Sequence, residues 1–494
     1  MTVPPQQAEV VEFLRRLAAS EPAETHISLV FVGTDTVWKL KKAVRLAFLD
    51  FTSVDARRHF AQRELALNGP AAPGLYRDMV PVVRNADGTL GFGDGSDAAA
   101  VDWVLRMARI PSADFLDAIA SRGGLTPELL DTLGDAVAAF HASLPAATGF
   151  DPVAGLRRVI EGNAQAARDA GLDDRVVQHW QTGVLHALQR AAAWLSRRAA
   201  DGFVRRAHGD LHLGNMCLWQ GRPVPFDALE FDEGMATIDL GYDLAFLLMD
   251  LDRRASRAAA NRVLNRYVAR TGDAALTRGL PMFLSLRAMI RAHVEAKRGN
   301  ADSASGYLDG ADGYQAPRPP TMLAIGGLPA SGKSTLARAL APGIGNAPGA
   351  LVLRSDEIRK RQHHAAPEER LPLQAYSDAA SEAVFGELAA LAEAAASGGH
   401  SVIADATFID PRHRTMIEAS ARAAGAPFLG CWLEVPLDEL KARITARQRD
   451  ASDANLAVLR AASRRSPGAG EWRAIDASDS TAALAAMQAA VQAM

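Results

Sequence analysis

The sequence is poor in cysteine: its 494 residues include only Cys217 and Cys431. Each stands in an apolar run typical of a buried strand, so we expect buried thiols, and the count excludes a disulfide scaffold. At the N-terminus, Glu9 and Glu12 stand among the apolar positions, a pattern typical of an amphipathic helix and not of a signal peptide. A reducing, cytoplasmic location is therefore expected.

Long apolar runs are also missing. The most apolar stretch, IDLGYDLAFLLMDLD at 238–252, is interrupted by acidic residues, so we expect no membrane-spanning helix. No charge of one sign dominates, because 54 Lys and Arg stand against 57 Asp and Glu. This balance disfavours a dedicated nucleic-acid-binding or membrane-surface protein. A hydrophobic content of 48% over this length instead indicates a globular protein of more than one domain.

A stretch rich in Gly, Ala, Asp and Pro at about 301–320 divides the chain. The prolines at its end favour extended backbone and the end of the preceding helix. We therefore predict a linker there, with a first domain at 1–300 and a second at 321–494. Within the first domain, alternating apolar residues predict a strand-rich small lobe at about 26–106. Apolar residues three and four apart predict a helical lobe at about 107–300.

The second domain carries a phosphate-binding loop, GGLPASGKST, after a predicted strand and before a predicted helix. The pattern G-x-x-x-x-G-K-[S/T] lets backbone N–H groups turn toward an anion, and the helix N-terminus adds partial positive charge. We expect Lys333 to reach the β- and γ-phosphates of ATP and Ser334 to bind Mg²⁺. The predicted nucleotide-binding residues of this loop are Gly327, Ser331, Gly332, Lys333, Ser334 and Thr335.

Other predicted strands of this domain present further polar side chains near their ends. Because ligands gather at the carboxyl ends of parallel strands, we expect Asp356 to accept a proton from an acceptor hydroxyl and Arg359 to hold the acceptor. Asp405 is a candidate for the metal site. Arg443 and Arg447, four apart on one helix, are candidate lid arginines over the transferring phosphoryl group. The alternatives are a helix cap for Asp356 and a solvated helix face for each arginine.

The segments GLPASGKST, RSDEIRK, VIADATF and RITARQRD make residues 320–475 similar to P-loop kinases of the polynucleotide kinase, gluconate kinase and zeta-toxin group. The resemblance implies a parallel sheet between helices, ATP, Mg²⁺ and a hydroxyl acceptor. It does not choose between a sugar, a nucleotide and a nucleic-acid end.

The first domain contains AHGDLHLGNM, which allows two interpretations. His208, Asp210 and His212 alternate and could bind a metal, although zinc usually needs three or four ligands and no cysteine pair is near. Alternatively, Asp210 is the base of a phosphotransfer loop, and Asn215 and Asp227 are its magnesium ligands, in the order that protein kinases use. A predicted hairpin between Asn215 and Asp227 would return them side by side. This favours the second interpretation.

The small lobe offers the remaining parts of such a site. Lys39 and Lys41 lie on one side of a predicted strand, and Glu64 lies on the next predicted helix. A Lys–Glu pair clamps the α- and β-phosphates in kinase-like folds. The sequence does not decide between the two lysines, and Lys39 is preferred. Farther along, Asp239 and Asp243 are expected to brace helices, in preference to attracting a cationic acceptor.

The motifs HGDLHLGN and FDALEFDEG make residues 26–300 resemble the aminoglycoside phosphotransferase and choline kinase family, which implies a two-lobed, protein-kinase-like fold. A β-hairpin is predicted around Gly33–Asp35, and it lacks the G-x-G-x-x-G pattern. Taken whole, the chain resembles a bacterial two-domain family that joins such a domain to a P-loop kinase-like domain. The expected fold class is α/β and α+β. The resemblance names an architecture and not a substrate.

We therefore expect an ATP-dependent phosphotransferase, bifunctional, that transfers the γ-phosphoryl group of MgATP to hydroxyl groups of a small molecule. Two alternatives remain. One domain catalyses while the other binds nucleotide as a regulator, or the acceptor is the 5′-hydroxyl of a nucleotide or nucleic acid. The balanced charge makes nucleic acid an unfavoured partner. The sequence leaves the acceptor and the oligomeric state open.

Overall fold

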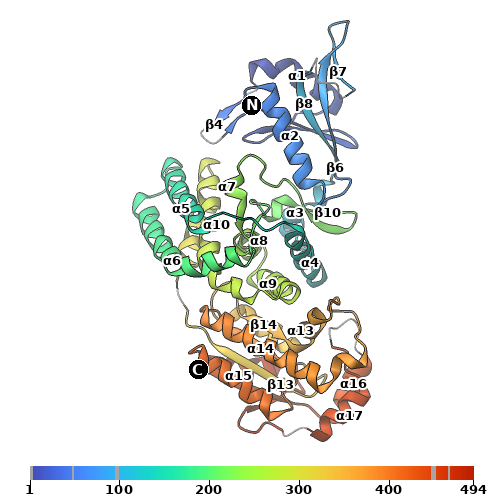
Figure 1. Ribbon diagram of the computed structural model, residues 1–494, viewed down its shortest axis with the longest axis vertical. Helices are drawn as coiled ribbons and strands as arrows, with labels where there is room; N and C mark the ends of the chain where they lie inside the picture. The colour runs from blue at the N-terminus through green and yellow to red at the C-terminus, as the bar shows by residue number, and fades with distance from the viewer. Residues whose placement is uncertain (1–3, 47–48, 95–99, 317, 447–451, 466–467) are drawn as a thin grey trace. The chain divides into compact units, whose positions relative to one another are not determined.

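The computed structural model describes residues 4–494 apart from 47–48, 95–99, 317, 447–451 and 466–467 (Figure 1). The chain forms two compact units, each assembled from separate segments. The first consists of Met1–Leu125, Ala139–Val159 and Ala192–Leu247. The second consists of Thr126–Ala138, Ile160–Ala191 and Leu248–Met494. The domain boundary expected near residue 300 stays a prediction.

The small lobe of the first unit is a six-stranded antiparallel sheet in the order β1-β2-β3-β8-β6-β7. Leu29, Phe31 and Leu40 are fully buried beside Leu14 of helix α1, because alternate residues of a strand face the same side. The predicted hairpin is confirmed as β2 and β3. The elements are α1 (Ala8–Ala18), β1 (Ala23–Glu24), β2 (Ser28–Val32), β3 (Thr36–Lys41), α2 (Val54–Asn68), β6 (Tyr76–Arg84), β7 (Leu90–Phe92) and β8 (Ala100–Ala108).

Residues 107–300 are mainly helical, as predicted; two short strand pairs are inserted there, and a third, β4 (Arg45–Leu46) with β5 (Leu49–Asp50), belongs to the small lobe. The helices are α3 (Leu116–Ser121), α4 (Pro127–Ser143), α5 (Pro152–Asp169), α6 (Asp174–Ala200), α7 (Glu233–Ala236), α8 (Leu240–Arg254), α9 (Arg257–Thr271) and α10 (Leu280–Lys297). The two inserted pairs are β9 (Val204–Arg206) with β12 (Thr237–Asp239), and β10 (Met216–Trp219) with β11 (Arg222–Pro225).

The linker predicted at 301–320 is wrong over its first part, where helix α11 (Ala301–Gly313) packs against α10. Its glycines lower helix propensity, but Ala304, Tyr307 and Ala311 recur three and four residues apart and are all buried. Burial of this apolar face outweighs the weak propensity.

A five-stranded parallel sheet in the order β14-β15-β13-β16-β17 forms the centre of the P-loop part of the second unit. Every residue of β13 is buried, as expected of a parallel strand covered on both faces. The strands are β13 (Met322–Gly327), β14 (Leu351–Arg354), β15 (Val402–Asp405), β16 (Phe428–Glu434) and β17 (Arg473–Asp476).

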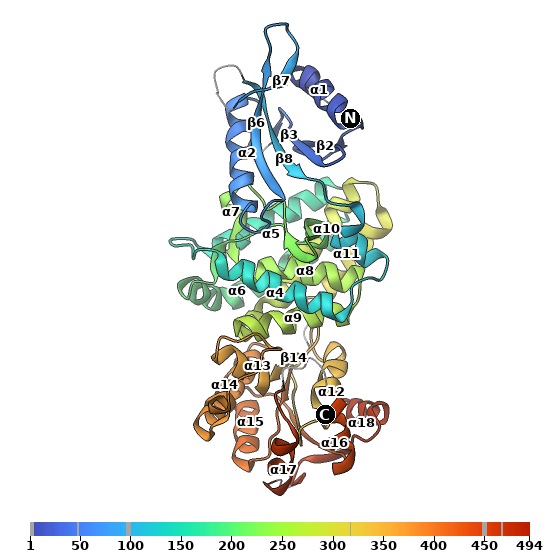
Figure 2. The same cartoon turned by 90° about the vertical axis from the view of Figure 1, so that its right-hand side faces the viewer.

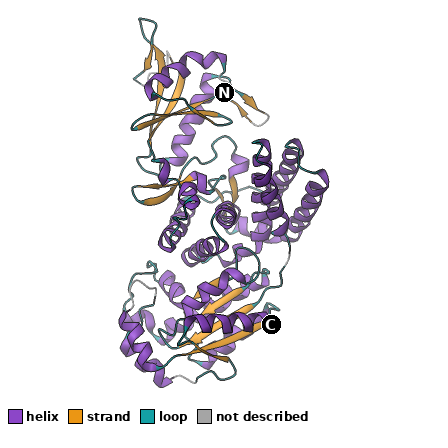
Figure 3. Ribbon diagram, turned by 180° about the vertical axis from the view of Figure 1, so that it is seen from behind, coloured by secondary structure: helices purple, strands orange, loops and turns teal. Residues whose placement is uncertain are grey.

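Helices cover both sides of this sheet, which confirms the predicted α/β arrangement. Figure 2 shows α12 and α18 on one side and α14 and α15 on the other, and Figure 3 shows the strands between them. Leu336 of α12 and Met487 of α18 share a core with Ile325 of β13. The helices are α12 (Lys333–Leu340), α13 (Ser355–Gln362), α14 (Asp378–Ser397), α15 (Pro411–Ala423), α16 (Leu437–Ala446), α17 (Leu456–Arg465) and α18 (Ser480–Gln492).

Helix α9 contacts the outer edge of this sheet within the second unit. Asn261 Nδ2 donates a hydrogen bond to the carbonyl of Ala350 at 3.0 Å, and Val352 N–H donates to Asn265 Oδ1 at 2.6 Å. These side chains pair backbone groups that an edge strand otherwise leaves open. They therefore fix the position of β14, whose end carries site residues.

Cys217 and Cys431 are buried free thiols, as predicted. None of the described helices combines the length and the apolar character that crossing a membrane requires.

Candidate active sites

Two lysines of β3 share one carboxylate of α2. Lys39 Nζ donates to Glu64 Oε1 at 2.7 Å, and Lys41 Nζ donates to Glu64 Oε2 at 2.8 Å. Alternation along β3 puts both lysines on one face, and the Glu64 side chain between them has no exposed surface. The structure thus brings both predicted lysines to the predicted glutamate.

Their second partners distinguish the two lysines. Lys39 Nζ also donates to Asp227 Oδ1 at 2.5 Å, and its side chain is 11% exposed. Lys41 pairs instead with Glu230, and its side chain is 2% exposed. Lys39 therefore contacts Asp227, the candidate metal ligand, whereas Lys41 pairs with Glu230 and has almost no exposed surface. Sequence reasoning missed Glu230, since only the acidic run around it gave any signal.

Charge keeps Lys39 and Glu64 ionised near neutral pH. Burial lowers the pKa of Lys39, but the charges of Asp227 and Glu64 outweigh it and hold that pKa well above its usual value. Burial raises the pKa of Glu64, but Lys39 and Lys41 outweigh it and bring that pKa down to about 2. Two lysines face three carboxylates, since Glu230 joins the cluster. The carboxylate oxygens suit a Mg²⁺ ion.

Asp210 and Asn215 lie side by side. Asn215 Nδ2 donates to the backbone carbonyl of Asp210 at 2.9 Å and to its Oδ2 at 2.9 Å. His212 Nε2 lies 3.6 Å from Asp210 Oδ2, and the Asp210 side chain is 42% exposed. An exposed carboxylate held in place by a neighbouring amide can accept a proton from a bound hydroxyl.

The hairpin predicted between Asn215 and Asp227 is confirmed as β10 and β11. Phe226 N–H donates to the carbonyl of Asn215 at 3.0 Å, so the next residue, Asp227, returns beside Asn215. Asp227 has a φ of 61°, and its N–H donates to Tyr76 Oη at 3.0 Å. A non-glycine residue in the left-handed region costs of order 1–3 kcal/mol, and such strain is concentrated at functional sites.

Buried Asp243 anchors the loop that carries Asp210. Its Oδ2 accepts the N–H of His208 at 3.1 Å, and its Oδ1 accepts the N–H of Gly209 at 2.9 Å. His141 Nε2 lies 3.1 Å from Asp243 Oδ2. Asp243 was predicted to brace helices; it lies beside His141 of α4, which was not predicted, and it also holds the loop of Asp210.

The alternating histidines both form hydrogen bonds within the loop region. The ring of His208 is buried, lies 2.9 Å from the carbonyl of Phe226, and has its pKa lowered by burial. His212 Nδ1 accepts the N–H of Gly214 at 3.0 Å. Among the described residues, neither histidine belongs to a group whose ligand atoms converge on one point. The hydrogen bonds of both rings thus support the phosphotransfer interpretation of AHGDLHLGNM, and the choice between the two interpretations stays a prediction.

We expect Asp243→Ala to lower the free energy of unfolding by about 3–5 kcal/mol, because two buried N–H groups and a histidine lose their partner. Urea denaturation followed by circular dichroism measures this change. Asp201→Ala, at an exposed position, is the control and should stay within about 0.5 kcal/mol. An unchanged denaturation midpoint for Asp243→Ala would contradict an anchoring role.

In the second unit, the phosphate loop connects β13 to α12. Gly327 has a φ of 147°, and a Cβ there would lie 2.7 Å from Ser331 Oγ, so the loop requires glycine. Lys333 Nζ donates to the carbonyls of Gly327 at 3.1 Å and Leu328 at 2.9 Å. Ser331 Oγ is buried and has no hydrogen-bond partner in the structure. This orphaned hydroxyl fits a loop built to hold an anion.

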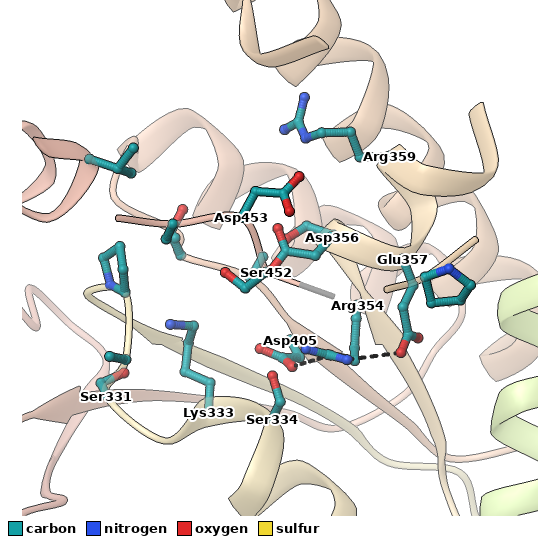
Figure 4. Close-up of a pocket in the computed structure, with 18 of the residues that line it drawn as sticks. Ser331, Lys333, Ser334, Arg354, Asp356, Glu357, Arg359, Asp405, Ser452 and Asp453 are labelled. Atoms are coloured by element: carbon teal, nitrogen blue, oxygen red, sulfur yellow. Dashed lines mark hydrogen bonds and ion pairs between the residues drawn. The ribbon is translucent and has the colours of Figure 1, made fainter. Parts of the chain in front are cut away.

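Carboxylates gather beside this loop (Figure 4). Asp405 lies near Ser334 and receives a hydrogen bond from Arg354 Nε at 3.2 Å; Arg354 Nη1 also donates to Glu357 at 2.9 Å. Arg354 was not predicted as a site residue, although it is the first residue of the motif RSDEIRK. Asp356 lies inside the first turn of α13, beyond the N-cap position, so the helix-cap alternative is wrong.

The predicted arginines have different surroundings. Arg359 is buried, donates to the carbonyl of Ala375 at 2.5 Å, and lies 4.8 Å over the Tyr376 ring. Arg443 donates to the carbonyl of Ala477 at 3.0 Å and lines the same cavity as the phosphate loop. Arg447 lies outside the described residues. The roles of all three stay predictions.

The phosphate loop lines a cavity of about 1950 Å³ together with Asp356, Arg359, Asp405 and Arg443. Part of its wall comes from α4 and α9, which lie outside the predicted second domain. There, Arg262 pairs with Asp131 at 2.6 Å, and Arg266 pairs with Asp135 at 2.6 Å and with Glu368 at 2.8 Å. Asp453, also missed by sequence reasoning, lines the cavity and accepts from Lys360, Leu371 and Tyr376.

Two family models match the chain. Residues 109–279 match the phosphotransferase enzyme family, a segment that contains Asp210, Asn215 and Asp227. Residues 322–467 match an AAA domain, which contains the phosphate loop. The chain therefore carries a kinase-like phosphotransferase domain followed by a P-loop kinase-like domain. These matches support a phosphotransferase.

Relatives are similar over nearly the whole chain. An uncharacterized protein of Mycobacterium tuberculosis is 27% identical over 460 residues, which cover 90% of this chain and 89% of that protein. Among solved structures, a choline/ethanolamine kinase family protein from Mesorhizobium loti is 15% identical with a TM-score of 0.39, covering 62% of this chain and 94% of that one. A sugar kinase from a Janibacter species is 19% identical with a TM-score of 0.27, covering 34% and 94%.

Proposed function

We propose that the protein transfers the γ-phosphoryl group of ATP to hydroxyl groups of small molecules and that both domains catalyse. One observation carries the proposal. Three segments far apart in the sequence bring Lys39 to Glu64 and Asp227, next to the hydrogen-bonded pair of Asp210 and Asn215. Lys39 is mostly buried and Glu64 is fully buried, and removing their charges from water costs free energy. Such charges require a function or a charged partner.

In the first domain, Asp210 takes the proton of the acceptor hydroxyl. The hydroxyl oxygen bonds to the γ-phosphorus while the bond from phosphorus to the ADP oxygen breaks, and ADP leaves with the electron pair. Lys39, oriented by Glu64, contacts the phosphates. Asn215 and Asp227 supply oxygen ligands for Mg²⁺, which offsets the negative charge of the phosphates when bound.

In the second domain, a phosphoryl transfer of the same kind uses Asp356 to take the proton of the acceptor hydroxyl. Lys333 exchanges its hydrogen bonds to the loop carbonyls for bonds to the β- and γ-phosphates, which are stronger because both partners are charged. Ser334 and Asp405 supply the oxygen ligands for Mg²⁺. Arg443, on the same cavity wall, adds positive charge near the phosphates.

The charge of the cavity supports a small acceptor. Acidic and basic side chains line it in nearly equal number, and several are already paired with each other. A nucleic-acid strand requires an excess of basic groups to neutralise its phosphates. A small molecule with hydroxyl groups does not, so it is the acceptor class we propose for both domains.

Calorimetric titration with a non-hydrolysable ATP analogue and Mg²⁺ tests the proposal. We expect two sites per chain, with Lys39→Met removing one and Lys333→Met the other. ADP release is then measured against panels of sugars, amino sugars, polyols and nucleosides. Two sites with a single acceptor-dependent activity would favour a regulatory second nucleotide. Absence of binding at both sites would contradict the proposal.

A further inference from the structure

A second polar cluster lines the cavity of the phosphate loop, and nothing above assigns it a role. Glu382 of α14, Asp410 at the N-cap of α15 and His413 of α15 place one oxygen or nitrogen each within 4.8 Å of one another. His413 Nε2 lies 3.2 Å from Glu382 Oε1. The three side chains line the same cavity as Lys333 and Asp356.

The cluster is built rigidly and yet open to the cavity. The His413 ring stacks on Phe385 with centroids 3.7 Å apart and planes 9° apart, which fixes its orientation. The side chains of Glu382 and Asp410 are 43% and 23% exposed, so their oxygens can be reached by a bound molecule. A fixed imidazole beside two accessible carboxylates offers several hydrogen-bonding atoms in one small volume.

Arg412 decides what class of ligand this cluster suits. Its guanidinium pairs with Asp410 at 2.6 Å and with Glu382 at 3.2 Å. The guanidinium forms ion pairs with both carboxylates, and its positive charge would repel a metal ion placed between them. Asp378 lines the same part of the cavity, so carboxylates still outnumber the arginine, and an anionic ligand would be repelled. Neutral hydroxyl groups suit the cluster best, because they donate hydrogen bonds to carboxylates and can form a hydrogen bond with an imidazole nitrogen.

Arg359 connects the cluster to the proposed base. It lies on α13, one turn after Asp356, and its Nη2 lies 3.4 Å from the hydroxyl of Ser381, the residue before Glu382. Arg359 is also nine-tenths buried, and its Nε has no hydrogen-bond partner in the structure. The contact fixes α13 against the first turn of α14. Arg359 is therefore a positioning residue that holds Asp356 and Glu382 in the wall of one cavity.

We propose that Glu382, Asp410 and His413 bind the acceptor of the second domain and that this acceptor is a neutral, polyhydroxylated molecule, a sugar or a polyol. The inference rests on the phosphotransferase activity proposed for this domain. Hydroxyl groups of the acceptor donate to the two carboxylates and pair with His413 Nε2. A different hydroxyl of the same molecule then reaches Asp356 and receives the phosphoryl group.

The test measures ADP release and product mass with the full-length chain carrying Asp210→Asn, so that turnover reports the second domain. Acceptors are neutral hexoses and polyols, amino sugars, and aldonic acids of matched length. We expect a neutral sugar or polyol to be phosphorylated in a reaction that Lys333→Met slows by about 10²–10³-fold. Glu382→Gln should raise the KM for this acceptor about tenfold or more, since a hydrogen bond to a charged group is worth about 1.5–3 kcal/mol. His413→Gln should raise it about two- to tenfold, because an ordinary hydrogen bond is worth about 0.5–1.5 kcal/mol.

The KM for ATP should stay within about twofold in both variants, because a merely structural defect would move both constants. Glu393→Gln, an exposed position on α14 outside the cavity, is the matched control and should change neither. An aldonic acid that is a better acceptor than its neutral polyol would overturn the inference. So would an unchanged acceptor KM in both variants, or Lys333-dependent ADP release that no neutral sugar or polyol stimulates. Absence of any Lys333-dependent turnover, with nucleotide binding lost, would instead contradict the proposed function and the inference with it.

Discussion

Asp210→Asn is expected to lower the acceptor-dependent ADP release of the first domain by about 10²–10⁴-fold, the usual contribution of a general base. Asparagine keeps the size of the side chain and can still accept a hydrogen bond from Asn215 Nδ2. It cannot take the proton of the acceptor. The KM for ATP should change little, because the phosphates are expected to contact Lys39 instead.

Two comparisons make this result specific. His212→Gln, beside Asp210, should have a much smaller effect than Asp210→Asn, since neither alternating histidine is expected to hold a metal. Asp201→Asn, at an exposed position, should leave turnover unchanged. Full turnover by Asp210→Asn with every acceptor of the first domain would contradict catalysis there and favour a regulatory nucleotide site.

Lys333→Met is expected to lower the turnover of the second domain by about 10²–10³-fold, comparable to the loss of one charge-stabilising group in a preorganised site. The lysine begins α12 and reaches back over the loop, where its ammonium now contacts two carbonyls. Replacing Lys333 leaves the N–H groups of the loop in place but removes the ammonium charge that is expected to contact the phosphates. Turnover at saturating acceptor and nucleotide affinity by calorimetry measure the two consequences.

Lys441→Met provides the control for this substitution, because Lys441 lies on α16 with its side chain 50% exposed and outside the cavity. It should keep full activity. The two domains are expected to be independent, so Lys333→Met should leave the activity that depends on Asp210 intact. If either substitution alone removes all phosphotransfer, a single shared reaction would replace the bifunctional proposal.

The local parts of both domains could be predicted from the sequence. Alternating apolar residues fixed β2 and β3, because the two faces of a strand have different surroundings. The phosphate loop could be predicted because its glycines and Lys333 lie within a few residues of one another. The hairpin β10–β11 and the order of Asp210, Asn215 and Asp227 were predicted for the same reason.

Contacts between distant segments could not be predicted in this way. Lys41 pairs with Glu230 and His141 with Asp243, more than 100 residues apart in each case. The choice between Lys39 and Lys41 needed this information, because both alternate identically along β3. The helix at 301–313 was also missed, because its stability comes from packing against α10 and not from its own composition.

The sequence by itself determined the two classes of phosphate-handling motif and the strands and helices that carry them, since both depend on short-range spacing. Only the tertiary structure decided which lysine meets Asp227, what anchors the loop of Asp210, and which side chains share the cavity of the phosphate loop. Glu382, Asp410 and His413 carry no recognisable motif and come together only because α14 and α15 pack side by side. Packing of an apolar core fixes such positions, and the polar residues that it brings together leave no pattern along the chain.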